Sequence, residues 1–191
     1  TRDELIERFS LDRLNVSPAR FDYDKLEWMN GVYIRQAAVD DLAEALLPVY
    51  AEAGLQADLE TVCQIVPIIQ ERIKTLRDAL SWSGFIFQDK VDLDPKLLIG
   101  KKMDAPSSLD ALRRARDLVA RIEPFSPECL EQPLRDLAGE LGIKVGPLFG
   151  ILRGAVTGQR VSPPLFETMS IMGRERVLEQ MDRGIEILAN M

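Results

Sequence analysis

Apolar side chains recur every three or four residues along much of this chain, and this spacing constrains the fold more than any other feature. Between residues 177 and 188, for example, Val177, Leu178, Met181, Ile185 and Leu188 fall on one face of a helix. Glycine or proline separates such runs, and no alternation of apolar and polar residues has a convincing strand length. The sequence therefore predicts an all-α fold.

The segment from Leu141 to Phe166 differs from its surroundings because it contains no aspartate or glutamate. Its charged residues are all basic, whereas the whole chain carries 31 acidic and 24 basic residues. The basic residues are Lys144, Arg153 and Arg160. The glycines and prolines that punctuate the segment are Gly142, Gly146, Pro147, Gly150, Gly154, Gly158, Pro163 and Pro164. We call residues 141–166 the acid-free segment.

Proline placement in the acid-free segment predicts two helices joined by a turn. Pro147 suits the first turn of a helix over residues 147–156, because a proline there sacrifices no helical hydrogen bond. Gly158 suits the tight turn that follows. Ser162 with Pro163 behind it predicts the cap and the first turn of the next helix.

Two arginines lie beside predicted helix ends. Arg153 would face the N-terminus of the helix after the turn, where an anionic or hydrogen-bonding ligand can bind. Arg72 follows the end of one helix and precedes another, whose start is predicted by Thr75 and Asp78. Arginines in such places also cap helix ends and complement the helix dipole. On the residues alone, capping is the favoured role for Arg153, and both roles stay open for Arg72.

Several aromatic residues are expected to pack rather than to bind. Trp28 and Tyr33 lie in a helical pattern and are predicted to be in the core, although Asn30-Gly31 predicts a break or a bend in that helix. Trp82 and residues 85–87 form an aromatic cluster whose helical spacing favours packing between two bundles over base stacking.

Composition excludes several classes of function. The net charge of -7 argues against general affinity for nucleic acids or anionic membranes, although it permits a local basic face. The absence of histidine removes the commonest general base and metal ligand. Cys63 and Cys129 have no paired spacing, which favours a reduced, cytosolic compartment. We see neither a signal peptide nor an apolar run long enough to span a membrane.

Three stretches resemble one family, the bacterial-type glutamyl-tRNA synthetases. The C-terminal end of that family is similar to L-R-G-A-V-T-G (residues 152–158), S-P-P-L-F (162–166) and M-G-R-E-R-V (172–177). Its stem-contact segment is similar to F-D-Y-D-K-L-E-W-M-N-G-V-Y-I-R (21–35), and E-R-I-K-T-L (71–76) fits between the two. The resemblance covers essentially the whole chain.

This resemblance implies a domain organisation. Residues 1–38 would belong to a stem-contact fold, residues 39–92 to a first helical anticodon-binding lobe, and residues 93–191 to a second. The chain would be the anticodon recognition part of a glutamate-tRNA ligase and would bind the anticodon stem-loop of tRNA(Glu). The alternative is a helical protein-interaction module without RNA affinity.

The resemblance also implies roles for particular residues. Four residues would line the pocket for the first two anticodon bases: Arg153, Ser162, Pro163 and Leu165. Arg135 would contact the anticodon loop, and Arg72 would recognise the third base. Lys25 and Arg35 are candidate stem contacts, with solvated surface charge as the open alternative.

No catalytic residue is predicted in this chain. The histidine-containing and K-M-S-K signatures of class I synthetases are absent, so we expect the chain alone to be inactive. The resemblance places ATP and magnesium in a catalytic domain elsewhere in a longer ligase. We expect no cofactor and no metal here. The expected partner is tRNA(Glu), without DNA or membrane binding, and the expected state is a cytoplasmic monomer.

Overall fold

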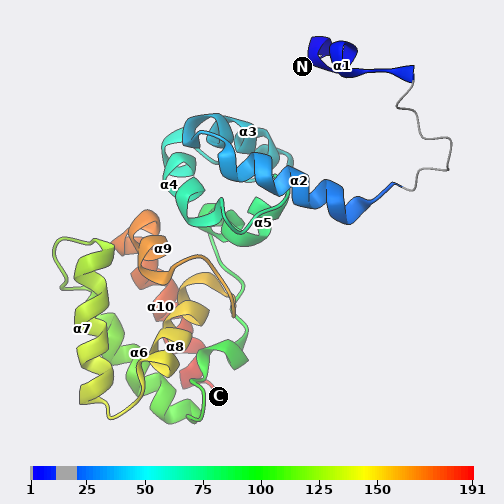
Figure 1. Ribbon diagram of the computed structural model, residues 1–191. Helices are drawn as coiled ribbons and strands as arrows, with labels where there is room; N and C mark the ends of the chain where they lie inside the picture. Colours follow the sequence, from blue (N-terminus) through cyan, green and yellow to red (C-terminus); the bar gives the residue numbers. More distant parts are fainter. Residues whose placement is uncertain (1, 12–20) are drawn as a thin grey trace.

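The computed structural model describes residues 2–11 and 21–191 and shows a helical protein (Figure 1). Its α-helices are α1 (Arg2–Arg8), α2 (Tyr23–Gln36), α3 (Val39–Glu52), α4 (Leu59–Ile69), α5 (Asp78–Ser83), α6 (Ala105–Val119), α7 (Pro127–Glu140), α8 (Val145–Thr157), α9 (Leu165–Met172) and α10 (Arg174–Ala189). Two short 3-10 helices, η2 (Gly84–Phe87) and η3 (Pro95–Leu98), lie between α5 and α6. The described ranges contain no strand, so the predicted all-α fold is confirmed.

The helices pack as two groups on one continuous core. We call α3, α4, α5 and η2 the first lobe, and η3 with α6 to α10 the second lobe; α9 lies against α4 where the lobes meet (Figure 1). Val91 and Leu93, in the segment that connects the lobes, are buried in the same core. The core is continuous across this connection. The domain boundaries at residues 38 and 92 are not tested by the packing and stay predictions. Part of the first predicted domain, residue 1 and residues 12–20, lies outside the described residues.

Helix α2 runs without interruption through Asn30 and Gly31, so a break at this pair is wrong, and a bend stays a prediction. The side-chain amide of Asn30 donates a hydrogen bond to the carbonyl oxygen of Lys74. Gly31 is buried beside the same residue, and a Cβ there would lie 3.7 Å from the Lys74 Cα. The Asn-Gly pair therefore forms the contact between α2 and the turn after α4, and tertiary contact outweighs the weak helix propensity of glycine.

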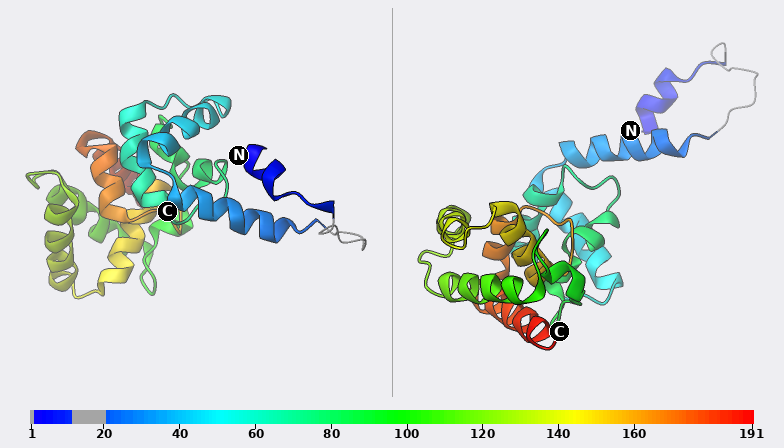
Figure 2. Two further views of the ribbon diagram at one scale, coloured as in Figure 1. Left: turned by 45° about the horizontal axis from the view of Figure 1, so that its top comes forward. Right: turned by 90° about the horizontal axis from the view of Figure 1, so that it is seen from below.

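The prediction that Trp28 and Tyr33 lie in the core is also wrong, because they are 64% and 69% exposed. Figure 2 shows the first half of α2 projecting away from the two lobes. Besides the Asn30 contact, the Glu27 carboxylate lies 4.0 Å from the Lys74 ammonium, and the Gln70 amide holds the end of the helix by donating to the carbonyl oxygens of Ile34 and Ala37 at 2.8 and 2.9 Å. Helical spacing identifies an apolar face, but it does not say which element covers that face.

The aromatic cluster at the end of the first lobe has the packing role that its spacing predicts. Phe85 and Ile86 in η2 are buried. The ring of Phe87 meets Tyr50 of α3 edge-on, with 4.9 Å between the centroids, and the Tyr50 hydroxyl bonds to the Ser83 hydroxyl at 2.6 Å. The first lobe therefore presents a well-packed end to the second.

Candidate nucleic-acid interface

The turn after α8 has the backbone conformation that the sequence predicts. Gly158 caps α8 with a φ of 64°, in the left-handed region. A Cβ at this position would meet the carbonyl oxygen of Asp92 and would lie 2.7 Å from Val91 Cγ1. Gly158 therefore serves two purposes: it reverses the chain, and it lets the connection between the lobes lie directly against the turn. Helix α8 starts at Val145, two residues earlier than predicted, because a proline in the first turn interrupts no helical hydrogen bond.

The second helix of the acid-free segment starts later than predicted. Helix α9 begins at Leu165, and no side chain caps it, so the prediction that Ser162 caps this helix is wrong. The reason is the second proline. A residue that precedes proline is restricted to extended conformations, so Pro163 keeps Ser162 out of the helix and Pro164 does the same to Pro163. The paired prolines thus leave an extended stretch between the turn and α9.

Arg153 binds this extended stretch. Its Nη1 donates to the carbonyl oxygens of Ser162 and Pro163 at 3.3 and 2.9 Å and also to the Ser162 hydroxyl. The Ser162 hydroxyl donates in turn to the Pro163 carbonyl oxygen at 3.0 Å. We call Arg153, Ser162 and Pro163 the Arg153 corner. Among the described residues, all hydrogen bonds that the guanidinium of Arg153 donates come from Nη1. Its other side-chain N–H groups are therefore left for a ligand.

Burial changes the electrostatics of this corner. Arg153 is half-buried, and its pKa is lowered because removal from water disfavours the charged guanidinium. A partly desolvated cation interacts more strongly with any acceptor that reaches it. Ser162 and Leu165 are only 8% and 4% exposed, and Leu165 belongs to the core. The surface that this corner can offer is therefore mainly arginine and backbone.

Arg135 lies on α7 next to this corner. Its guanidinium sits over the ring of Phe149 in α8, 5.5 Å from the centroid, and that ring meets Phe166 of α9 edge-on at 5.0 Å. Arg135 also bonds to Glu131 one turn earlier, with Nε 2.8 Å from the carboxylate oxygen. Packing between α7, α8 and α9 therefore brings this arginine toward the end of the acid-free segment.

Arg72 lies on the first lobe, just after α4. Its Nη1 donates to the Ile68 carbonyl oxygen at 3.0 Å, so it does cap the end of that helix. Its guanidinium also lies over the half-buried ring of Trp82, 5.9 Å from the centroid. We call Arg72 and Trp82 the Arg72 corner. The carboxylate of Asp78 fixes the turn between them by accepting from the backbone N–H groups of Lys74 and Thr75 at 2.8 and 2.9 Å.

The two corners meet through a residue that was not singled out in the sequence. Gln159, just after the Gly158 turn, donates from its side-chain amide to the carbonyl oxygen of Ser81 at 2.8 Å. Ser81 directly precedes Trp82. The only available signal was the position of Gln159 inside the acid-free segment, since side-chain contact between residues 78 apart cannot be derived from spacing.

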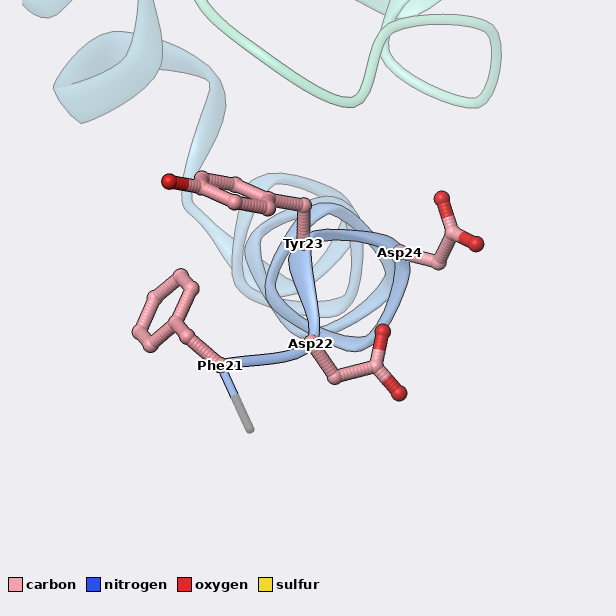
Figure 3. A pocket seen from close by; sticks show the side chains of 4 residues that line it. All are labelled: Phe21, Asp22, Tyr23 and Asp24. Carbon is pink, nitrogen blue, oxygen red and sulfur yellow. The ribbon is translucent and has the colours of Figure 1, made fainter. Parts of the chain in front are cut away.

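The remaining two candidates lie on α2. Arg35 is exposed near its end, and Lys25 is exposed in its first turn, where Asp22 accepts from the Lys25 N–H at 3.0 Å. Figure 3 shows the carboxylates of Asp22 and Asp24 at the start of this helix, with the Phe21 and Tyr23 rings on the other side. These residues line a shallow hollow whose carboxylates would repel a phosphate backbone.

No group of histidine, cysteine, aspartate and glutamate suited to a metal ion is found among the described residues. None of the helices in residues 2–11 and 21–191 is long and apolar enough to cross a membrane.

Comparison with known proteins identifies the family. A family model described as "Anticodon binding domain" matches residues 41–185. The chain is 46% identical to the glutamate–tRNA ligase of Roseiflexus castenholzii, over 99% of this chain and 38% of that protein. It is 40% identical to the glutamate–tRNA ligase of Dehalococcoides mccartyi strain CBDB1, over 100% of this chain and 40% of that protein. The chain thus spans about two fifths of the length of these curated relatives.

A solved structure shares the fold. The glutamate tRNA ligase from Elizabethkingia meningosepticum, in complex with its amino acid, superposes with a TM-score of 0.83 and 23% identity, covering 96% of this chain and 36% of that one. At this identity the likeness shows the fold alone. The resemblance to glutamyl-tRNA synthetases is confirmed by the curated relatives, and the family match covers both lobes. This chain belongs to the anticodon binding domain family.

Proposed function

We propose that this chain binds the anticodon stem-loop of tRNA(Glu) as the anticodon recognition part of a glutamate–tRNA ligase. Recognition of single-stranded RNA needs donors for the Watson–Crick edges of splayed bases and flat groups on which bases stack. The Arg153 corner offers a planar guanidinium on a rigid backbone, and the Arg72 corner offers a guanidinium that already lies on an indole ring.

One observation carries this proposal: the fold brings the Arg153 and Arg72 corners, from different lobes, to the same junction through the Gln159–Ser81 hydrogen bond. Capping alone explains why each arginine lies at a helix end. It does not explain why two such ends should meet. A short RNA loop with three adjacent unpaired bases needs separate contacts that lie close together.

The proposed roles follow the family resemblance residue by residue. The first two anticodon bases would be bound by Arg153, Ser162, Pro163 and Leu165, the loop by Arg135 and the third base by Arg72; Lys25 and Arg35 would contact the stem. Two of these residues would act indirectly. The Ser162 hydroxyl is already bonded to Arg153 and Pro163, and Leu165 is in the core, so both act mainly by shaping the corner.

The proposal extends to the longer protein. A ligase that contained this chain would join glutamate to tRNA(Glu) with ATP and magnesium held in its catalytic domain. We expect this chain by itself to support neither glutamyl-tRNA formation nor pyrophosphate exchange. A cytoplasmic location and a monomeric state belong to the same proposal.

A protein-interaction module is the second candidate, and the exposed face of α2 favours it. Leu26, Trp28, Met29 and Tyr33 are 40% to 69% exposed on that helix. Such a face can bind another protein surface without any RNA. These residues lie along α2, whose first half projects from the lobes, so the two functions would use different parts of the chain (Figure 2).

Fluorescence anisotropy with labelled RNA distinguishes the candidates. The chain is titrated into the anticodon stem-loop of tRNA(Glu) and into the same stem with a scrambled anticodon, at low and at moderate salt. We expect tighter binding to the native loop at both salt concentrations. Equal affinity for both RNAs, or no binding at low salt, contradicts anticodon recognition and leaves the protein-interaction module as the better account.

A further inference from the structure

A chain of hydrogen bonds leads from Arg153 to the Arg72 corner through Gln159. The Thr157 hydroxyl donates to the Arg153 carbonyl oxygen at 2.8 Å and accepts from the backbone N–H of Gln159 at 3.2 Å. The Gln159 side-chain amide then donates to the Ser81 carbonyl oxygen at 2.8 Å. The backbone of Gln159 is therefore held by α8, and its side chain is held by the first lobe.

The far end of this chain reaches the residues that hold Arg72. Ser81 precedes Trp82, whose ring lies under the Arg72 guanidinium. The Ser81 hydroxyl donates to the Asp78 carbonyl oxygen at 2.8 Å, and Asp78 caps the turn that follows Arg72. A shift of the Gln159 turn would therefore move the backbone that positions both the indole ring and the guanidinium.

The lobes do not depend on Gln159 for their attachment. Arg176 of α10 donates from Nη2 to the carbonyl oxygens of Phe85, at 3.4 Å, and Gln88. Burial lowers the pKa of Arg176, as expected for a guanidinium withdrawn from water at the junction. The helices α4 and α9 also pack against each other. Removal of the Gln159 amide should therefore leave the lobes in place and affect only the connection between the corners.

We propose that Gln159 is a positioning residue that couples the two corners, so that a correct base in one corner strengthens binding of the base in the other. This inference rests on the proposed anticodon recognition and adds a residue and an energetic link to it. A neutral hydrogen bond contributes modestly, so we expect a coupling factor of about three- to tenfold in affinity. Gln159 need not touch the RNA.

The test is a cycle of four RNAs measured with wild type and Gln159→Leu. The RNAs are the native anticodon stem-loop and its variants changed at the first base, at the third base and at both. Each change should lower the affinity of wild type by some factor. The factor for the doubly changed RNA should be about three- to tenfold smaller than the product of the two single factors. For Gln159→Leu the losses should multiply to within about twofold, with a preference retained at each base.

Gln132→Leu is the matched control. Gln132 also lies in the second lobe and also donates one 2.8 Å hydrogen bond, but to Asp136 one turn along its own helix. It should behave as wild type. Gln159→Ala, which introduces no new apolar side chain, should repeat the effect of Gln159→Leu, and thermal unfolding checks that each variant is folded.

The outcomes separate the two proposals. Loss of coupling in both Gln159 variants but not in Gln132→Leu supports the inference. A wild type that prefers both native bases but shows no coupling, or the same coupling in all variants, overturns the inference and leaves anticodon recognition standing. Loss of all base preference in the Gln159 variants also overturns it, because Gln159 would then contact the bases. A wild type without base preference overturns the proposed function itself.

Discussion

The Arg153 corner and the Arg72 corner hold their arginines in opposite ways. Arg153 is half-buried, and its Nη1 is fixed by the backbone of an extended stretch that two prolines stiffen. Arg72 is exposed and is held by a carbonyl oxygen of the helix just before it and by the face of Trp82. The first arrangement is built before any ligand arrives, whereas the second allows the guanidinium to move.

Because of this difference, changes at the two arginines should affect stability and RNA recognition to different extents. Loss of a half-buried side chain leaves its acceptors unsatisfied, so a change at Arg153 affects folding as well as binding. Loss of an exposed side chain affects binding almost alone. The preformed corner should therefore be the stricter of the two in the base it accepts, since it loses less conformational freedom on binding.

The largest expected effect is on the free energy of unfolding, at the glycine that ends α8 near the Arg153 corner. Gly158→Ala should lower the free energy of unfolding by about 3 kcal/mol, because it adds a left-handed alanine and forces the new Cβ against the backbone of Asp92. Gly142→Ala is the matched control. Its φ of +65° nearly equals the +64° of Gly158, but a Cβ there meets nothing within 4 Å. It should cost about 1 kcal/mol. Urea denaturation measures both, and equal costs would show that the Asp92 contact is unimportant.

A smaller effect is expected for the arginine of that corner. Arg153→Ala should lower stability by about 1–3 kcal/mol, because the Ser162 carbonyl oxygen loses its side-chain donor and the Pro163 carbonyl oxygen is left with the Ser162 hydroxyl. Arg153→Lys should restore part of this stability but little of the base preference, since an ammonium lacks the planar fork of a guanidinium. Thermal unfolding and stem-loop binding measure the two properties. A lysine that restores base preference fully would mean that only charge matters here.

Arg72 should show the reverse pattern. Arg72→Ala should change stability by no more than about 0.5 kcal/mol and should still weaken binding by about 1–3 kcal/mol. Trp82→Leu removes the ring beneath the guanidinium and should weaken third-base preference in the same direction. Isothermal titration with the native stem-loop measures the binding loss. A stability loss as large as that of Arg153→Ala would remove the distinction between the corners.

The smallest effect is expected for a basic residue outside both corners. Lys144 is exposed, at the cap position of α8. Lys144→Ala should weaken binding to every stem-loop about equally and reduce the salt slope by at most about one, as for a phosphate contact. Binding measured at several salt concentrations tests this. A base-dependent effect would extend the recognition site toward the start of α8.

The sequence predicts the parts of this molecule that depend on local chemistry. Helical spacing leads to the all-α fold, and Gly158 leads to the tight turn, because each follows from the conformational preference of single residues. Arg72 falls at the end of a helix as predicted, since the helix stop and the next start are both visible in the sequence.

What the sequence could not predict depends on contacts between distant residues. Ser162 is a local exception, because Pro164 keeps Pro163 out of the helix and so moves the start of α9 beyond the reach of a Ser162 cap. Trp28 and Tyr33 have the spacing of core residues, but nothing among the described residues covers them. Gln159 gave no signal beyond its place in the acid-free segment, because its partner Ser81 is brought to it by the packing of the two lobes.

The central claim is that the two corners recognise different anticodon bases. The most direct measurement compares wild type, Arg153→Ala and Arg72→Ala against stem-loops changed singly at the first or third base, at two salt concentrations, in the longer ligase proposed to contain this chain. We expect Arg153→Ala to lose preference mainly at the first base and Arg72→Ala at the third, with little change in salt slope. Base preferences that stay intact in both variants would contradict it, and the arginines would then be helix caps alone.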